Sequence, residues 1–223
     1  MENKKYKFPI AAIFFIIFAV VKMWGVRTSL TSLSSAMGEN TPNQIQIGFI
    51  LELLFLGLVL LLAFMLILFR DSYLLLIPTV GMCLAELVTI VVSLIIGSLI
   101  PEDGESVMEG VSSLLSGYGL MNLIYHILLL AGHIVLVSIV VIGKMKKLKV
   151  LMKYTWWNAP VIYVIARFFQ AWMMKGLMVD YNVSFFRAFF LMGAIDFVFI
   201  LGTFFMGLFL AHPYKEEISH VTE

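Results

Sequence analysis

The sequence predicts an all-α integral membrane protein, built as a bundle of six transmembrane helices with its N-terminus and C-terminus in the cytoplasm. Of its 223 residues, 61% are hydrophobic and only 13% are charged, whereas about one quarter of the residues in a soluble domain are charged. Apolar runs of the roughly 20 residues that cross a bilayer recur along nearly the whole chain. The distribution of lysine and arginine between these runs predicts the orientation.

Six spans emerge when the apolar runs are cut at charges, prolines and polar loops, and their bounds are 8–26, 46–69, 73–100, 118–143, 157–178 and 186–211. They leave no room for a soluble domain, so residues 1–223 are interpreted as a single membrane domain. The first span follows three lysines, as a secretory signal does, but the nearest cleavage-like site, Ser34-Ser35-Ala36, lies far beyond its apolar core. We therefore expect this span to be retained.

The fifth span, 157–178, is the least hydrophobic because it contains Pro160 and Arg167. It begins at two adjacent tryptophans, Trp156 and Trp157, and follows a strongly basic segment. Tryptophan and lysine are both enriched where a helix leaves the membrane on its cytoplasmic side. These flanks favour a membrane crossing despite the polar residues.

Basic residues gather on one side of the predicted bundle. With the N-terminus inside, four fall on the outer side: Lys22, Arg27, Lys175 and Arg187. The inner side then holds ten, which are Lys4, Lys5, Lys7, Arg70, Lys144, Lys146, Lys147, Lys149, Lys153 and Lys215. This positive-inside bias predicts cytoplasmic termini, with the Ser/Thr-rich segment 27–46 and the acidic segment 101–119 as external loops.

Six ionisable residues fall within the spans and come from five of them. A charge at the bilayer centre costs a few kcal/mol on insertion scales, so such residues usually face the bundle interior, pair with one another or serve a function. Arg167 stays protonated and requires a partner, for which Asp196 and Glu86 are the expected carboxylates. The six residues are Glu52, Glu86, His126, His133, Arg167 and Asp196.

Small and polar residues recur at helical spacing in four spans, which predicts that these faces point inward together. Positions three, four and seven apart share one face of a helix. The stripes are Thr79, Cys83, Glu86, Ser93 and Gly97 in the third span; Gly119, Asn122, His126 and His133 in the fourth; Pro160, Tyr163, Arg167 and Gln170 in the fifth; and Gly193, Asp196, Thr203 and Gly207 in the sixth.

Depth along each span predicts two tiers of polar residues. At about 1.5 Å per residue, Glu52, Glu86, His126 and Asp196 lie in the outer half, whereas Arg167 and His133 lie near the midplane. The two histidines share a helix face but are about 10 Å apart along the axis, too far to bind one metal ion at Zn–N distances of about 2.0–2.1 Å. Two roles are open for each histidine. It forms a hydrogen bond between helices, or it is one step of a polar path that carries protons through the bundle.

We predict that the protein binds or transports a small solute or ion through a polar chamber in the outer half of the bundle. The predicted binding residues are Glu86, His126, Arg167 and Asp196, with His133 as a lower station or proton relay and Glu52 as a peripheral member near the outer end of its span. The length and helix count are similar to those of the small substrate-binding subunits of energy-coupling-factor vitamin transporters, a likeness that no sequence motif accompanies.

Two other functions stay open. One is an intramembrane hydrolase, in which Glu86, His126 and Asp196 act as metal ligands or as acid and base. Binding is favoured over catalysis, because the sequence has no H-E-x-x-H, no G-x-S-x-G and no histidine pair at one-turn spacing. The other is a non-catalytic accessory or immunity protein of the membrane, whose polar residues only hold helices together. No cofactor is expected, because two histidines on one helix face cannot both be axial ligands of one haem.

The expected partners are the lipid bilayer, a small-molecule or ion ligand and a partner subunit or second copy of the chain, because six helices enclose only a modest cavity. A formal charge of +1 does not imply nucleic acid. The single cysteine, Cys83, offers neither a disulfide framework nor a Cys-rich metal site. The expected location is a cell membrane crossed several times, the bacterial cytoplasmic membrane.

Overall fold

The computed structural model describes residues 10–37, 43–69, 73–99, 117–145, 149–177 and 185–211, and all regular structure within them is helical. Long apolar runs favour helices in a bilayer because a helix satisfies its own backbone hydrogen bonds. The elements are α1 (Ile10–Met37), α2 (Asn43–Leu68), the 3₁₀ turn η1 (Tyr73–Leu75), α3 (Leu76–Leu99), α5 (Gly117–Lys144), the short α6 (Lys149–Thr155), α7 (Asn158–Leu177) and α8 (Phe185–Ala211).

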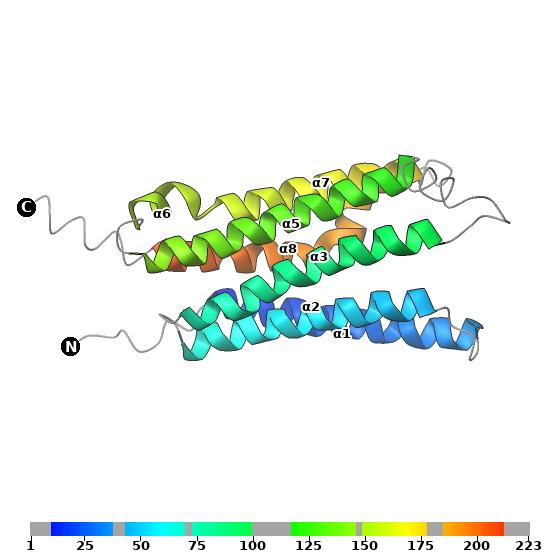
Figure 1. Cartoon of the computed structure of the whole chain (residues 1–223), viewed down its shortest axis with the longest axis horizontal. Helices are drawn as coiled ribbons and strands as arrows, with labels where there is room; N and C mark the ends of the chain where they lie inside the picture. The colour runs from blue at the N-terminus through cyan, green and yellow to red at the C-terminus, as the bar shows by residue number, and fades with distance from the viewer. Residues whose placement is uncertain are drawn as a thin grey trace, which may run out of the picture.

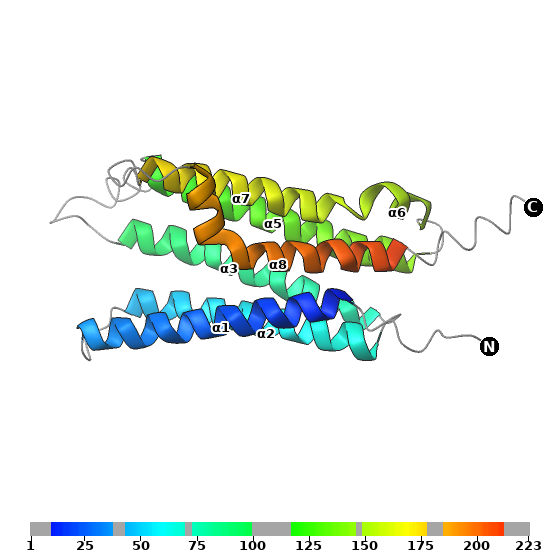
Figure 2. The ribbon, with the colours of Figure 1, turned by 180° about the vertical axis from the view of Figure 1, so that it is seen from behind.

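The six long helices form a closed ring in chain order (Figure 1). Each packs against the helix before it and the helix after it, and α8 packs against α1, which closes the ring. Figure 2 shows this last seam, where α1 and α8 run side by side. The direction of the helices alternates around the ring, so the start of α1 and the end of α8 lie at the same end of the bundle.

Large apolar side chains cover the outside of this ring, which is the reverse of a soluble protein. Five of the described helices have segments long and apolar enough to cross a membrane: Ile10–Thr28, Phe49–Leu68, Tyr73–Ile95, Leu120–Gly143 and Gly193–Ala211. The exposed residues include Ile13, Val20, Leu54, Phe64, Leu84, Val91, Ile127, Ile134 and Leu201. The chain is therefore a helical, polytopic membrane protein.

Helix α7 is the long helix outside that set of five, in line with the expectation that span 157–178 is the least hydrophobic. It packs between α5 and α8. A turn at Trp156 and Trp157 separates it from α6, and Pro160 in its first turn has no N–H to donate to the Trp156 carbonyl. A Cβ on Gly207 would collide with that carbonyl oxygen, so the glycine lets the turn pack closely on α8.

The first helix corrects two expectations. Span 8–26 was bounded by the charges at its end, and segment 27–46 was expected to be a loop, yet α1 continues to Met37 and α2 begins at Asn43. Serine and threonine do not end a helix when their hydroxyls bond its own carbonyls, as Thr28 Oγ1 does to the Gly25 oxygen at 2.8 Å. At about 42 Å, α1 exceeds the roughly 30 Å hydrocarbon thickness. Of the segment 101–119, which was expected to be an external loop, residues 101–116 lie outside the described part of the chain.

An apolar core fills the end of the ring that holds the start of α1 and the end of α8. Its members come from all six long helices and from α6, and none has more than 8% of its surface exposed. They include Ala12, Phe15, Leu62, Leu66, Met82, Leu136, Ile139, Met152, Ala159 and Met206. The ionisable side chains that face the interior lie in the other half of the ring, whereas Thr79 and Thr203 are buried beside this core.

Candidate functional site

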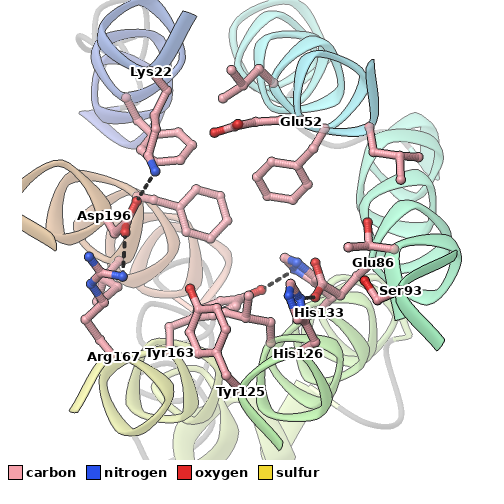
Figure 3. Close-up of a pocket in the computed structure, with 18 of the residues that line it drawn as sticks. Lys22, Glu52, Glu86, Ser93, Tyr125, His126, His133, Tyr163, Arg167 and Asp196 are labelled. Carbon is pink, nitrogen blue, oxygen red and sulfur yellow. Dashed lines mark hydrogen bonds and ion pairs between the residues drawn. The ribbon is translucent and has the colours of Figure 1, made fainter. Parts of the chain in front are cut away.

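A chamber of about 400 Å³ lies inside the ring, further from the chain ends than the apolar core (Figure 3). Every long helix contributes to its wall. Its volume falls at the lower end of the range of about 300–1,000 Å³ typical of ligand pockets. The polar lining residues are Lys22, Glu52, Glu86, Thr89, Ser93, Tyr125, His126, His133, Tyr163, Arg167 and Asp196.

Two cations share one carboxylate on one side of the chamber. Lys22 Nζ of α1 lies 3.2 Å from Asp196 Oδ1 of α8, and Arg167 Nη1 of α7 lies 3.0 Å from Asp196 Oδ2. The Arg167 side chain is 6% exposed, whereas those of Lys22 and Asp196 are 29% and 21% exposed. These ion pairs link three consecutive helices of the ring, with Arg167 as the deeply buried charge.

The position of Arg167 depends on the absence of a side chain at Gly193. A Cβ built on Gly193 would collide with the Nε, Nη2 and Cζ atoms of Arg167. The guanidinium therefore lies directly against the α8 backbone, one helical turn from Asp196. In Figure 3 the ring of Tyr125 lies beside the same guanidinium on the chamber side.

A carboxylate and an imidazole pair on the facing wall. Glu86 Oε1 of α3 lies 2.7 Å from His126 Nδ1 of α5, within hydrogen-bond distance. The Glu86 side chain is 9% exposed and that of His126 is 20% exposed. Glu52 of α2 also lines the chamber, and Figure 3 shows its carboxylate directed into the open space.

Aromatic rings and His133 form the floor of the chamber. The Tyr163 hydroxyl lies 2.6 Å from His133 Nδ1, and both residues are almost completely buried. The rings of Phe55 and Phe199 each contact the imidazole, and Phe199 also contacts Tyr163. A Cβ on Gly132 would come within 2.6 Å of Tyr163 Cε1, so this glycine makes room for the phenol ring. The floor separates the polar chamber from the apolar core.

Many residues of the four predicted stripes are buried or line the chamber, whereas Cys83, Asn122 and Gln170 are half-buried and do not line it. Thr79, Glu86, Tyr163, Arg167 and Thr203 are buried. Gly97 and Gly119 lie outside the residues whose surroundings are described. The pairing expected between Arg167 and Asp196 is present, but Glu86 pairs with His126 instead.

The expected tiers are wrong for Arg167. Depth along the helix placed Arg167 with His133 near the midplane. Its long side chain, however, brings the guanidinium to Asp196, which was assigned to the outer tier. His133 bonds Tyr163 and stays in the floor. Glu52, expected to be peripheral, lines the chamber with the other carboxylates.

Lys22 is the charged residue that sequence reasoning missed. The count of basic residues placed it at the outer end of the first span, whereas it lies inside α1 and pairs with Asp196. The signal that could have found it is its helical spacing from Phe15, Phe18, Ala19 and Val26, which are all buried. Tyr125, Thr89 and Ser93 were also not selected as chamber residues, although Ser93 lay on a predicted stripe.

A metal site needs at least three converging ligands in most cases. Among the described residues, no three His, Cys, Asp or Glu side chains lie close enough together to hold a metal ion. Glu86 and His126 meet, whereas Asp196 bonds Lys22 and Arg167 on the opposite wall. The three residues expected as a metal set are therefore not brought together.

Comparison of the chain with protein-family models, curated proteins and solved structures gives no match. Function is therefore inferred from the geometry and chemistry of the chamber.

Proposed function

We propose that this protein binds or transports a small solute through the chamber in the outer half of its helical ring. The observation that carries the proposal is the convergence of Lys22, Glu86, His126, Arg167 and Asp196 on one chamber inside an apolar bundle. Intramembrane charges are costly and usually mark solute or ion pathways. Two or three such residues would suffice to hold helices together, whereas here ionisable residues from all six long helices face one cavity.

The proposed topology has six spans within a single membrane domain, and both termini lie in the cytoplasm. Helix α7 is the span that is added to the five most apolar helices. Lys22 no longer counts toward the outer side, so ten basic residues face three across the membrane. The chamber then lies nearer the outer face, and its solute enters from outside the cell. The basic segment 144–153 supports the bacterial cytoplasmic membrane with this orientation, because its lysines favour anionic headgroups.

Labelling of introduced cysteines tests this topology. In a Cys83→Ser background, Glu105→Cys should react with a membrane-impermeant maleimide in intact cells. Lys147→Cys should react only after the cells are permeabilised. The opposite pattern would reverse the orientation, and labelling of both in intact cells would show an even number of crossings between the two positions, against the single crossing proposed.

The hydrolase alternative loses support from the positions of its expected metal ligands, because Asp196 is held by two cations across the chamber from Glu86 and His126. The Glu86 and His126 pair alone offers an acid and a base but no metal-activated water. The accessory-protein alternative makes a different prediction: its chamber has no ligand, and charge removal only lowers stability.

Thermal unfolding of the purified protein in detergent separates these functions. Divalent metals, vitamins, amino acids and amines are tested one at a time, with Glu86→Gln and Arg167→Gln as variants and Arg27→Gln as the matched control. Arg27 is an exposed cation of the same bundle that does not line the chamber. A ligand at 100 times its Kd stabilises the folded state by about 2.7 kcal/mol, which raises Tm measurably.

Solute binding predicts that at least one compound raises the Tm of the wild type and of Arg27→Gln but not of the chamber variants. Stabilisation by zinc alone would favour the hydrolase. If no compound acts and the chamber variants simply unfold at lower temperature, the charges only hold helices together and the proposal is wrong.

A further inference from the structure

The charges of the chamber are separated by sign around the ring. Helices α7, α8 and α1 are consecutive in the ring and carry Arg167, Asp196 and Lys22. Helices α2 and α3 carry Glu52 and Glu86, and the next helix, α5, carries His126. Figure 3 shows Lys22, Asp196 and Arg167 on one side of the open space and Glu86 and His126 on the other, with the Glu52 carboxylate reaching into the space from α2.

Each half of the ring has a net charge, although the whole chamber is close to neutral. Lys22 and Arg167 against the single carboxylate of Asp196 leave one positive charge on the first half. Glu52 and Glu86 leave two negative charges on the second half, or one when His126 is protonated. The chamber therefore carries a charge separation across its width.

Much of the remaining wall is apolar. Phe18, Leu51, Phe55, Leu129, Phe199 and Ile200 line the space together with the charged residues. A bound molecule would thus meet cations at one side, carboxylates at the other, and hydrocarbon or aromatic rings beside both. The volume of about 400 Å³ limits it to a compact molecule.

We propose that the ligand of this chamber is a compact zwitterion of the amino-acid class, with its carboxylate toward Lys22 and Arg167 and its ammonium toward Glu86 and Glu52. This inference rests on the proposed solute-binding function and specifies its substrate class. Arginine presents a planar set of N–H donors that suits a carboxylate, and lysine adds a point charge beside it. The apolar wall receives the side chain of the ligand.

Simple ions fit the chamber less well than a zwitterion. An inorganic or organic cation would be attracted by the acidic half but would gain nothing from Lys22 and Arg167 on the other half. An anion would do the reverse and would be repelled by Glu52 and Glu86. A zwitterion matches both halves in one orientation, and this is the physical basis of its selection.

Charge-blocked analogues test the inference. The probes are the twenty proteinogenic L-amino acids, β-alanine and γ-aminobutyrate, each compared with its methyl ester and its N-acetyl derivative by thermal unfolding and calorimetric titration in detergent. At least one free amino acid should bind, and its ester and N-acetyl derivative should each bind at least about tenfold more weakly, a loss of about 1.4 kcal/mol.

Two variants assign the halves of the chamber. Lys22→Gln should reduce the difference in affinity between the free amino acid and its methyl ester, because one partner of the ligand carboxylate is gone. Glu86→Gln should instead reduce the difference in affinity between the free amino acid and its N-acetyl derivative. Lys22→Arg keeps the positive charge and should still bind the free amino acid more tightly than its ester. This control shows that the effect of Lys22→Gln comes from the lost charge and not from misfolding. Arg27→Gln, on the same helix as Lys22 but outside the chamber, should behave as wild type.

The outcomes distinguish this inference from the function on which it rests. An ester that binds as tightly as the free amino acid would make the ligand a cation, and an N-acetyl derivative that does so would make it an anion. If no zwitterion binds but a metal, vitamin or amine from the wider panel does, the chamber binds a solute and the proposal of a zwitterionic ligand is wrong. If nothing from either panel binds, both proposals fail.

Discussion

Replacement of Asp196 by asparagine removes the carboxylate that Lys22 and Arg167 share while preserving the shape of the side chain. The variant should be destabilised by more than any other single charge removal in the chamber. The reason is that Asp196→Asn leaves two cations inside the ring with a neutral amide between them, whereas Lys22→Gln leaves the pair of Arg167 with Asp196 intact.

The magnitude follows from the burial of the two pairs. Loss of one partner of a buried ion pair costs about 3–5 kcal/mol, and an exposed pair contributes about 0–1 kcal/mol. The Arg167 side chain is 6% exposed, but Asp196 retains 21% exposure and asparagine still accepts a hydrogen bond. We therefore expect about 3 kcal/mol for Asp196→Asn and about 1 kcal/mol or less for Lys22→Gln.

The assay is equilibrium unfolding in mixed micelles of mild detergent and dodecyl sulfate, followed by circular dichroism. Arg167→Gln and the double variant Arg167→Gln/Asp196→Asn complete a double-mutant cycle. Residues in one ion-pair network have interaction free energies of about 0.5–3 kcal/mol. Effects of Asp196→Asn and Arg167→Gln that add within error would refute the reasoning, as would a larger loss for Lys22→Gln than for Asp196→Asn.

Two further predictions concern close packing and the floor of the chamber. Gly193→Ala should displace the Arg167 guanidinium and reduce the free energy of unfolding by about 1–3 kcal/mol, the usual cost of overpacking, as measured in the same micelles. Tyr163→Phe should cost about 1–3 kcal/mol, because it removes the hydroxyl beside the buried Nδ1 of His133 and leaves that nitrogen without its partner.

Both predictions have matched controls in the same bundle. Gly57→Ala adds a methyl group where no atom lies within 4 Å, so its unfolding free energy should be unchanged or slightly higher than that of the wild type. Tyr73→Phe removes a hydroxyl from an exposed residue and should be neutral. A Gly193→Ala protein as stable as Gly57→Ala would show that Arg167 is not held against α8, and a neutral Tyr163→Phe would show that the floor hydrogen bond contributes nothing.

The positions of the helices were largely predictable from the sequence. The predicted spans 46–69, 73–100, 118–143, 157–178 and 186–211 agree with the observed helices to within a few residues, because in each case an apolar run ends where polar residues begin. The exception is the first helix. Its apolar run ends near Thr28, but the helix itself continues to Met37, because loss of hydrophobicity ends a membrane crossing and not necessarily a helix.

The contents of the chamber were partly predictable. Helical spacing placed Glu86, His126, Arg167 and Asp196 on inward faces, because polar residues on a lipid-exposed face carry a free-energy cost. The same test, applied to the first span, would have selected Lys22. It was not applied there because Lys22, although within the predicted span 8–26, was counted with the basic residues of the outer side.

The pairing of these residues could not be read from one sequence. Spacing within a helix fixes which residues share a face, but pairing depends on which faces meet and on how far each side chain reaches. The ring in chain order brings α3 to α5 and α7 to α8, so Glu86 meets His126 and Arg167 meets Asp196. Depth estimates from Cα positions fail most for arginine, whose guanidinium lies several ångströms from its own backbone.

The same charges contribute to folding and to the proposed binding, and this decides how chamber variants must be interpreted. Lys22, Asp196 and Arg167 link α1 to α8 and α7, at the seam that closes the ring between the first and last helices. A variant of any of them can therefore lower Tm without any ligand. Only the change in Tm on addition of a ligand reports binding, and only a change in preference between a free amino acid and its blocked derivative reports which charge recognises which group.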